Sequence, residues 1–237
     1  MRQSKGSLFL LPSPISDQSL GSISPEVIQI LHRLDYFIVE KARTARRFIS
    51  ATQPERPIDV LKISEMPRTM TDKTIIREQL QPLLEGHDVG ILSEAGLPAI
   101  ADPGNVYVAA AHEMGISVVP LSGPSSILMA LIGSGLEGQR FMFHGYLSAK
   151  REELEKQLPQ LERQADRDDA TQIWIEAPYR NHQVMEAAGK MLSGKRRFCI
   201  AAGLGDDSGF VQTKTISDWV KQKWPDIHKI PTVFLLR

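Results

Sequence analysis

Short apolar runs alternate with amphipathic stretches along the first half of the chain. Runs of apolar residues that end at Pro, Gly or polar residues are typical of strands buried on both faces of a sheet. They occur at residues 7–11, 36–39, 89–92 and 116–121, with a shorter candidate at 59–63. Helical spacing of apolar residues predicts helices at 25–34, 46–49, 71–84 and 106–114. This alternation predicts βαβ units and a parallel sheet.

The pattern changes after a break at residues 120–123, where Pro, Ser and Gly interrupt the apolar periodicity. Strands are predicted at 140–146, 173–175, 198–202, 209–213 and 232–236, and helices at 127–132, 150–163 and 181–192. Some of these strands follow one another with no helix between them, which favours a mixed sheet. The sequence therefore predicts two α/β domains, residues 1–120 with a largely parallel sheet and residues 121–237 with a mixed one.

Residues 89–104 form the stretch that looks most like a ligand site. The apolar strand 89–92 breaks into small residues and prolines, and Asp102 and Pro103 then read as the N-cap and first residue of a helix. Three other loops that follow strands, 12–14, 122–126 and 201–205, have similar compositions. Each alone is explained by a turn. Together they indicate a ligand pocket at the carboxyl edge of a parallel sheet.

Composition narrows the possible functions. Among the 237 residues, 28 Lys and Arg balance 28 Asp and Glu, so no overall charge attracts the protein to nucleic acid or membrane. Cys199 is the only cysteine, which excludes an intramolecular disulfide and fits a reducing compartment. The first apolar stretch is too short for a signal peptide or a membrane span. We expect a cytoplasmic protein that does not enter a membrane.

Several familiar chemistries find no support in the sequence. It contains no P-loop motif, no G-x-G-x-x-G after a strand and no G-x-S-x-G elbow. The six histidines show no metal-ligand spacing, so no metal site is predicted. Residues 43–47, which include three arginines, could bind phosphate, although a solvated helix face is the favoured interpretation. Cys199 is interpreted as a small buried hydrophobe.

Five motifs, in order along nearly the whole chain, point to one family. They are Ser13-Pro14-Ile15-Ser16-Asp17-Gln18, the loop at residues 93–104, Pro120-Leu121-Ser122-Gly123-Pro124-Ser125, the stretch from Ser134-Gly135-Leu136 to Lys150, and Glu176-Ala177-Pro178-Tyr179-Arg180. With these motifs the chain resembles the tetrapyrrole-methylase superfamily of S-adenosylmethionine-dependent methyltransferases. It is most similar to the branch that methylates the ribose 2′-oxygen of a cytidine in 16S ribosomal RNA.

This resemblance implies a fold, a ligand and a set of binding residues. The implied class III fold has two α/β domains with the ligand in a cleft between them, commonly in a homodimer. S-adenosylmethionine is the implied methyl donor and S-adenosylhomocysteine the product, with no metal. The residues implied to bind the donor are Pro14, Ser93, Glu94, Ala95, Gly96, Ile100, Ser125, Ser126, Ile127, Ala202 and Thr232. The small residues among them would let the ligand approach the backbone closely.

Departures from the family pattern leave the methyl acceptor open. The family's E-D-T-R reads Glu40-Lys41-Ala42-Arg43 here, its A-R-E-L-T-K reads as residues 201–206 without the Arg and Glu, and its loop aspartate is Glu94. The chain is thus a divergent member. Ribosomal RNA, within the small ribosomal subunit, is the acceptor implied by kinship. The alternatives are a small molecule such as a tetrapyrrole, or a donor-binding protein without catalysis. Glu40, Lys150 and Glu176 are the candidate catalytic residues.

Overall fold

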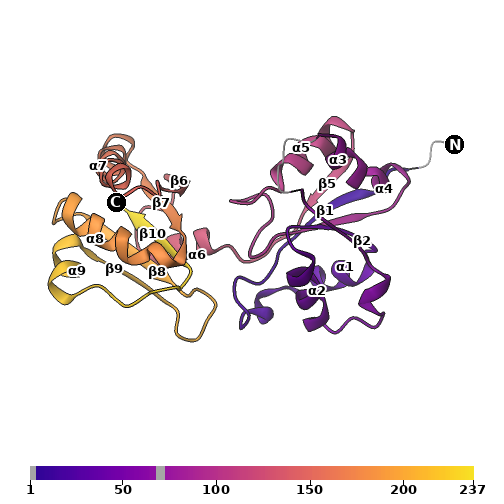
Figure 1. The fold of residues 1–237 in the computed structure, drawn as a ribbon, viewed down its shortest axis with the longest axis horizontal. Helices are drawn as coiled ribbons and strands as arrows, with labels where there is room; N and C mark the ends of the chain where they lie inside the picture. Colours follow the sequence, from indigo (N-terminus) through magenta and orange to yellow (C-terminus); the bar gives the residue numbers. More distant parts are fainter. Residues whose placement is uncertain (1–3, 68–72) are drawn as a thin grey trace. The chain divides into compact units, whose positions relative to one another are not determined.

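The strands form two five-stranded sheets, one in each of two units of the chain. The computed structural model describes residues 4–67 and 73–237 (Figure 1). The units are Met1–Ser125 and Ser126–Arg237. Within the described ranges, no helix is long and apolar enough to cross a membrane. The predicted class, two α/β domains of which the first has a parallel and the second a mixed sheet, is confirmed.

All strands of the first sheet run parallel. They are β1 (Ser7–Leu11), β2 (Tyr36–Val39), β3 (Lys62–Glu65), β4 (Val89–Leu92) and β5 (Ser117–Pro120), in the order β3-β2-β4-β1-β5. Neighbouring strands are in parallel register, for example Leu8 beside Val89 and Leu11 beside Leu92. Parallel strands place all of their carboxyl ends at one edge, which is where ligand loops gather.

Helices cover both faces of this sheet (Figure 1). On one face lie α1 (Pro25–Arg33) and α2 (Ala42–Ala51), and on the other α3 (Lys73–Gln79), α4 (Gln81–Leu84) and α5 (Asn105–Glu113). Successive strand side chains alternate between the faces, so that Phe9 packs with α1 and α2 while Leu8 packs with α3 to α5. The near-continuous apolar composition of the strands follows from burial on both sides.

Three local predictions for this unit need correction. The strand predicted at 59–63 lies at Lys62–Glu65, after a short 3-10 helix at Ile58–Val60. The single helix predicted at 71–84 is two helices, α3 and α4, and residues 71 and 72 lie outside the described ranges. Asp102 is not a helix N-cap, because α5 begins at Asn105. The Asp102 carboxylate instead accepts hydrogen bonds from the N–H groups of Ala99 and Gly104, both at 2.7 Å, and closes the loop on itself.

The second sheet is mixed. Its strands are β6 (Phe141–Tyr146), β7 (Thr171–Glu176), β8 (Arg197–Ala202), β9 (Phe210–Thr215) and β10 (Thr232–Leu236), in the order β6-β7-β10-β8-β9. Only β6 and β7 pair in parallel, and the other pairs are antiparallel. On one face lies α6 (Ser126–Ser134), and on the other α7 (Arg151–Asp168), α8 (Asn181–Met191) and α9 (Ile216–Gln222).

Sequence patterns missed α9 because its seven residues are too few to show a helical period. Its position is fixed by two contacts. Thr215 caps the helix by accepting a hydrogen bond from the Asp218 N–H at 3.1 Å, and the Trp219 indole donates to the Phe198 carbonyl at 2.8 Å. Cys199 is fully buried in this unit, as predicted, and burial raises the pKa of its thiol to about 11. The cysteine therefore packs as a hydrophobe and is a poor nucleophile.

Candidate functional site

Three loops meet at the carboxyl edge of the parallel sheet. Ser13, just after β1, and Gly96, after β4, exchange two backbone hydrogen bonds of 2.8 and 3.0 Å. The Ser13 hydroxyl also donates to the Ser93 carbonyl at 2.9 Å. A Cβ on Gly123, after β5, would lie 2.1 Å from Cβ of Pro12, so this loop packs directly on the first one. Three of the four loops singled out from the sequence thus converge, whereas residues 201–205 lie in the second unit, at the end of β8.

Gly96 holds a conformation that favours glycine. Its φ is +74°, and an added Cβ would lie 3.3 Å from the Pro124 carbonyl oxygen and 3.6 Å from the Ile15 side chain. Its own N–H donates to Ser13. This amide is therefore part of the loop's internal structure, and what the loop presents to a ligand is the small surface of Ser93, Glu94 and Ala95.

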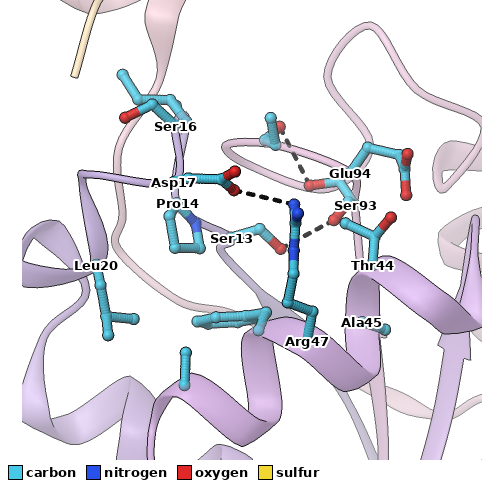
Figure 2. A pocket seen from close by; sticks show the side chains of 14 residues that line it. Ser13, Pro14, Ser16, Asp17, Leu20, Thr44, Ala45, Arg47, Ser93 and Glu94 are labelled. Atoms are coloured by element: carbon cyan, nitrogen blue, oxygen red, sulfur yellow. Dashed lines mark hydrogen bonds and ion pairs between the residues drawn. The ribbon is translucent and has the colours of Figure 1, made fainter. Parts of the chain in front are cut away.

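A cavity of about 310 Å³ opens beside these loops, within the first unit. Its size is at the lower end of the range for small-molecule sites. The β1 loop, helix α2 and the β4 loop enclose it, and Figure 2 shows Arg47 rising from α2 towards Asp17 across the opening. Its lining residues are Ser13, Pro14, Ile15, Ser16, Asp17, Leu20, Thr44, Ala45, Arg47, Phe48, Ala51, Ser93, Glu94 and Ala95.

Acidic side chains surround the β4 loop. Glu40, directly after β2, accepts a hydrogen bond from the Glu94 N–H at 2.9 Å. Burial raises the pKa of the Glu40 carboxyl, the Glu94 amide opposes that rise, and the charges of Asp102 and Glu94 add to it. Lys41 pairs with the Glu94 carboxylate at 2.6 Å, and this hydrogen bond raises the pKa of Lys41. The loop therefore carries more negative than positive charge, and a cationic ligand would relieve the excess.

Asp102 adds a second buried carboxylate. Burial raises its pKa, against the two backbone N–H groups that hydrogen-bond to Oδ1. Its Oδ2 atom is buried and has no hydrogen-bond partner among the described residues. Ala99 and Ala101, which both lie just before Asp102, have positive φ values, +66° and +60°, which are uncommon for residues with a Cβ. The turn that Asp102 stabilises is thus a strained part of the loop.

The residues implied to bind the donor fall into groups. Pro14, Ser93, Glu94 and Ala95 line the cavity, Gly96 adjoins it, and Ile100 is 45% exposed on the same loop. Ser125 ends the first unit, and Ser126 and Ile127 begin α6 in the second. Ala202 and Thr232 are buried opposite each other in the second sheet, on β8 and β10.

The candidate catalytic residues lie in different settings. Glu40 contacts the β4 loop as described. Glu176 is opposite Thr232 in the second sheet, is almost fully buried, and lies 3.3 Å from Arg180. Burial raises the pKa of Glu176, while the Ala177 N–H and Arg180 lower it. Lys150 precedes α7 with its side chain 80% exposed and pairs with Glu153 at 3.2 Å.

Sequence reasoning missed one side of the cavity. Asp17, Leu20, Thr44, Phe48 and Ala51 line it without having been singled out as candidates. Arg47 was noticed only within a basic cluster whose favoured interpretation was a solvated helix face. The pattern could not show that one turn of α2 faces the β1 loop, because this depends on tertiary packing. In the described part of the chain, no group of His, Cys, Asp and Glu could hold a metal ion.

Comparisons with known proteins agree with this architecture. Residues 18–215 match the family model of tetrapyrrole (corrin/porphyrin) methylases. The crystal structure of the methyltransferase CobJ has a similar fold, with a TM-score of 0.64, 20% identity and coverage of 98% of this chain and 93% of CobJ. An identity this low supports the fold alone.

Curated relatives are named ribosomal RNA small subunit methyltransferase I. The protein from Synechocystis sp. is 33% identical over 84% of this chain and 67% of its own length. The protein from Xylella fastidiosa is 36% identical over 61% of this chain and 50% of its own length. The protein from Pseudomonas aeruginosa is 30% identical over 92% of this chain and 74% of its own length. The chain thus spans half to three quarters of these relatives. By the extent of the family match and these identities, the chain belongs to the tetrapyrrole (corrin/porphyrin) methylase family.

Proposed function

We propose that this protein transfers a methyl group from S-adenosylmethionine to RNA of the small ribosomal subunit. The observation that carries this proposal is the 30–36% identity, over most of the chain, to proteins named ribosomal RNA small subunit methyltransferase I. The cavity at the carboxyl edge supports it, since residues implied to bind the donor line that cavity. The acceptor atom that kinship implies is the ribose 2′-oxygen of a cytidine.

The charge of the β4 loop suits a cationic donor. S-adenosylmethionine supplies a methyl group on a positively charged sulfonium, which leaves as the neutral thioether S-adenosylhomocysteine. Glu40, Glu94 and Asp102 place negative charge around the loop, and Lys41, which pairs with Glu94, offsets part of it. A positive ligand here is stabilised by these carboxylates, and more so because two of them are partly desolvated. The negative charge of the loop therefore favours binding of S-adenosylmethionine over binding of S-adenosylhomocysteine.

Alignment is the main task of the chain's own residues, because the leaving group is already activated. Glu40 contacts the β4 loop within the first unit, whereas Lys150 and Glu176 belong to the second unit. We assign Glu40 as a positioning residue that holds the Glu94 amide, and hence the loop that presents Ser93 to Ala95. Roles for Lys150 and Glu176 in catalysis stay predictions.

Calorimetry tests donor binding. We expect S-adenosylmethionine to bind more tightly than S-adenosylhomocysteine. We also expect its binding to release protons as the pH approaches the raised pKa of Glu40, because a nearby cation lowers that pKa. Comparing buffers of different ionisation enthalpy measures this release, and Glu40→Gln should reduce it. Absence of binding at millimolar ligand would contradict the proposal.

Transfer of a tritiated methyl group identifies the acceptor. We expect label in small-subunit RNA from a strain whose gene for this protein is deleted, and little in RNA from the parent strain. Donor binding with no label in either RNA would favour a protein that binds without catalysis. A copurifying porphyrinoid absorbance would favour a small-molecule acceptor instead.

We further propose, from the same kinship, a cytoplasmic homodimer. Exposed apolar side chains on the edge strand β6, Phe141, Met142 and Tyr146, are consistent with burial against a second copy. Light scattering coupled to size exclusion measures the molecular mass, and cell fractionation the compartment. A mass that matches a single 26.4 kDa chain at micromolar concentration would contradict the dimer.

A further inference from the structure

The cavity has two electrically different sides. Glu94, with Glu40 and Asp102 behind it, makes the side formed by the β4 loop acidic. Arg47 on helix α2 makes the opposite side basic, and Arg43 and Arg46 are exposed elsewhere on the same helix. Such a separation suits two ligands of opposite charge that meet in one place. A cation is expected on the acidic side, and a phosphate on the basic side.

Between these sides the cavity is largely apolar. Leu20, Ala45, Phe48 and Ala51 contribute carbon surface, as does Pro14. Figure 2 shows Pro14, Leu20 and Ala45 among the side chains around the cavity. An apolar pocket that contains an aromatic ring and has polar groups at its rim suits a nucleobase, which binds by stacking and by contacts at its edges. The Thr44 hydroxyl and Ser13 are among the polar groups of the lining.

The guanidinium of Arg47 is positioned at the opening. It pairs with Asp17 at 2.9 Å, but the two side chains are 68% and 81% exposed. A pair so exposed contributes little stability, so exchanging the carboxylate for another anion costs little. Phosphate accepts the same two-pronged hydrogen bonds from arginine as a carboxylate does. Asp17 therefore occupies the place that a phosphate would take.

We propose that this cavity binds the acceptor nucleotide of the RNA strand. Its base lies against Leu20 and Phe48, and its phosphate replaces Asp17 on Arg47. Phosphates of neighbouring nucleotides contact Arg43 and Arg46. The base must leave its stack to enter, as in other enzymes that act on single nucleotides. The proposal rests on the proposed function, and it places the acceptor beside the loop implied to bind the donor.

Two substitutions test the site and a third serves as control. Arg47→Ala removes the phosphate contact, and Ala51→Trp fills the cavity from an exposed position at the end of α2. Arg33→Ala is the matched control. Arg33 belongs to the same unit and also makes an exposed pair with an aspartate, Asp88, but beside the start of β4 at the opposite edge of the sheet.

We expect Arg47→Ala to raise the KM for small-subunit RNA by about tenfold or more, the usual effect of one charged hydrogen bond. The slope of log KM against log salt should fall by about 0.7, as for one lost contact to a single strand. Ala51→Trp should raise KM without the change in slope. The Kd for S-adenosylmethionine should stay within about twofold of wild type in both variants, and Arg33→Ala should change none of these values.

An increase of the donor Kd that equals the increase of KM would overturn the proposal, since the α2 side of the cavity would then bind the donor. NMR with the four nucleoside 5′-monophosphates at millimolar concentration tests the cavity without the reaction. We expect shifts of the Thr44, Ala45 and Ala51 methyl signals in wild type, and no shift at Thr44 and Ala45 in Ala51→Trp. Absence of shifts in wild type would refute nucleotide binding here. Failure of donor binding in calorimetry would instead refute the proposed function.

Discussion

The two sheets have the same number of strands but place their loops differently. In the parallel sheet every strand ends at one edge, and the loops after β1, β4 and β5 pack on one another there. In the mixed sheet β10 runs against both of its neighbours, so the strand ends and their loops are divided between the two edges. A cavity lined by loops is therefore a natural product of the first arrangement, and the described structure has one there.

Their interiors differ as well. The cores of the first unit are mainly aliphatic, and the strained and polar elements are gathered in its loops, at Gly96, Ala99 and Asp102. One core of the second unit contains an aromatic cluster of Trp174, Phe198, Trp219, Trp224 and Phe234, with ring centroids 5.8–6.1 Å apart. The comparison suggests that substitutions in the second core chiefly affect stability, whereas substitutions at the first edge chiefly affect binding.

The largest effect on stability is expected from Trp174→Ala. Trp174 is fully buried and packs against Phe198 and Phe234, so removing the ring leaves a cavity that costs about 3–5 kcal/mol. Trp174→Phe should cost much less, because the indole N–H is buried and has no partner among the described residues. Urea unfolding measures both values. Equal losses in the two variants would show that ring volume is not what stabilises this core.

The next effect tests the packing of the loops at the parallel edge. Gly123→Ala brings a Cβ within 2.1 Å of Pro12, and the loops must separate at a cost of about 1–3 kcal/mol. Because the loops separate, the affinity of this variant for the donor, measured by calorimetry, should also fall. Gly21→Ala in the same unit is the control, since no atom of the described residues, apart from the two chain neighbours, lies within 4 Å of the added Cβ. Unchanged donor affinity in Gly123→Ala would separate the loop packing from binding.

The sequence predicted most strands of both sheets because they are distinct apolar runs, and β1, β2, β4 and β10 have the limits that were expected. The polar strand β3 is the exception, and its predicted position was wrong. Small residues and prolines also marked the loops that meet at the parallel edge. The role of Asp102 could not be read in this way, since an N-cap and a carboxylate that closes a loop have the same local sequence. The α2 side of the cavity depends on packing between segments that are distant in the sequence, and local sequence patterns do not predict such packing.

Ion pairs provide a smaller and more direct contrast between the units. Arg196 in the second unit is only 15% exposed, donates two hydrogen bonds of 2.8 and 2.9 Å to Asp166, and donates one of 3.0 Å to Glu162. Arg196→Ala leaves Glu162 partly buried without this partner, and we expect a loss of about 1–3 kcal/mol. Arg47→Ala should cost about 0.5 kcal/mol or less, because its pair with Asp17 is exposed. Urea unfolding of both variants decides whether Arg47 is retained for stability or for binding.

The smallest expected effect is the pH dependence of stability that two carboxylates cause, and its sign is opposite in the two units. Burial raises the pKa of Glu40 above 4.5, whereas a hydrogen bond from Ser148 lowers that of Glu153 on α7. The stability that Glu40 contributes is therefore complete below pH 4.5 and is lost as the pH rises through its folded pKa. Glu153 contributes stability at neutral pH and loses it as the pH falls below 4.5.

Glutamine substitutions should therefore shift the melting temperature in opposite directions with pH. Glu40→Gln keeps an oxygen that can accept the Glu94 N–H but cannot ionise, so its Tm relative to wild type should increase as the pH rises from 4 to 7. Glu153→Gln loses its charge-assisted bonds to Ser148 and Lys150, and its relative Tm should decrease over the same range. Thermal unfolding in one buffer series measures both. Two curves of the same sign would show that the acidic loop of the first unit is no less solvated than the exposed surface of α7.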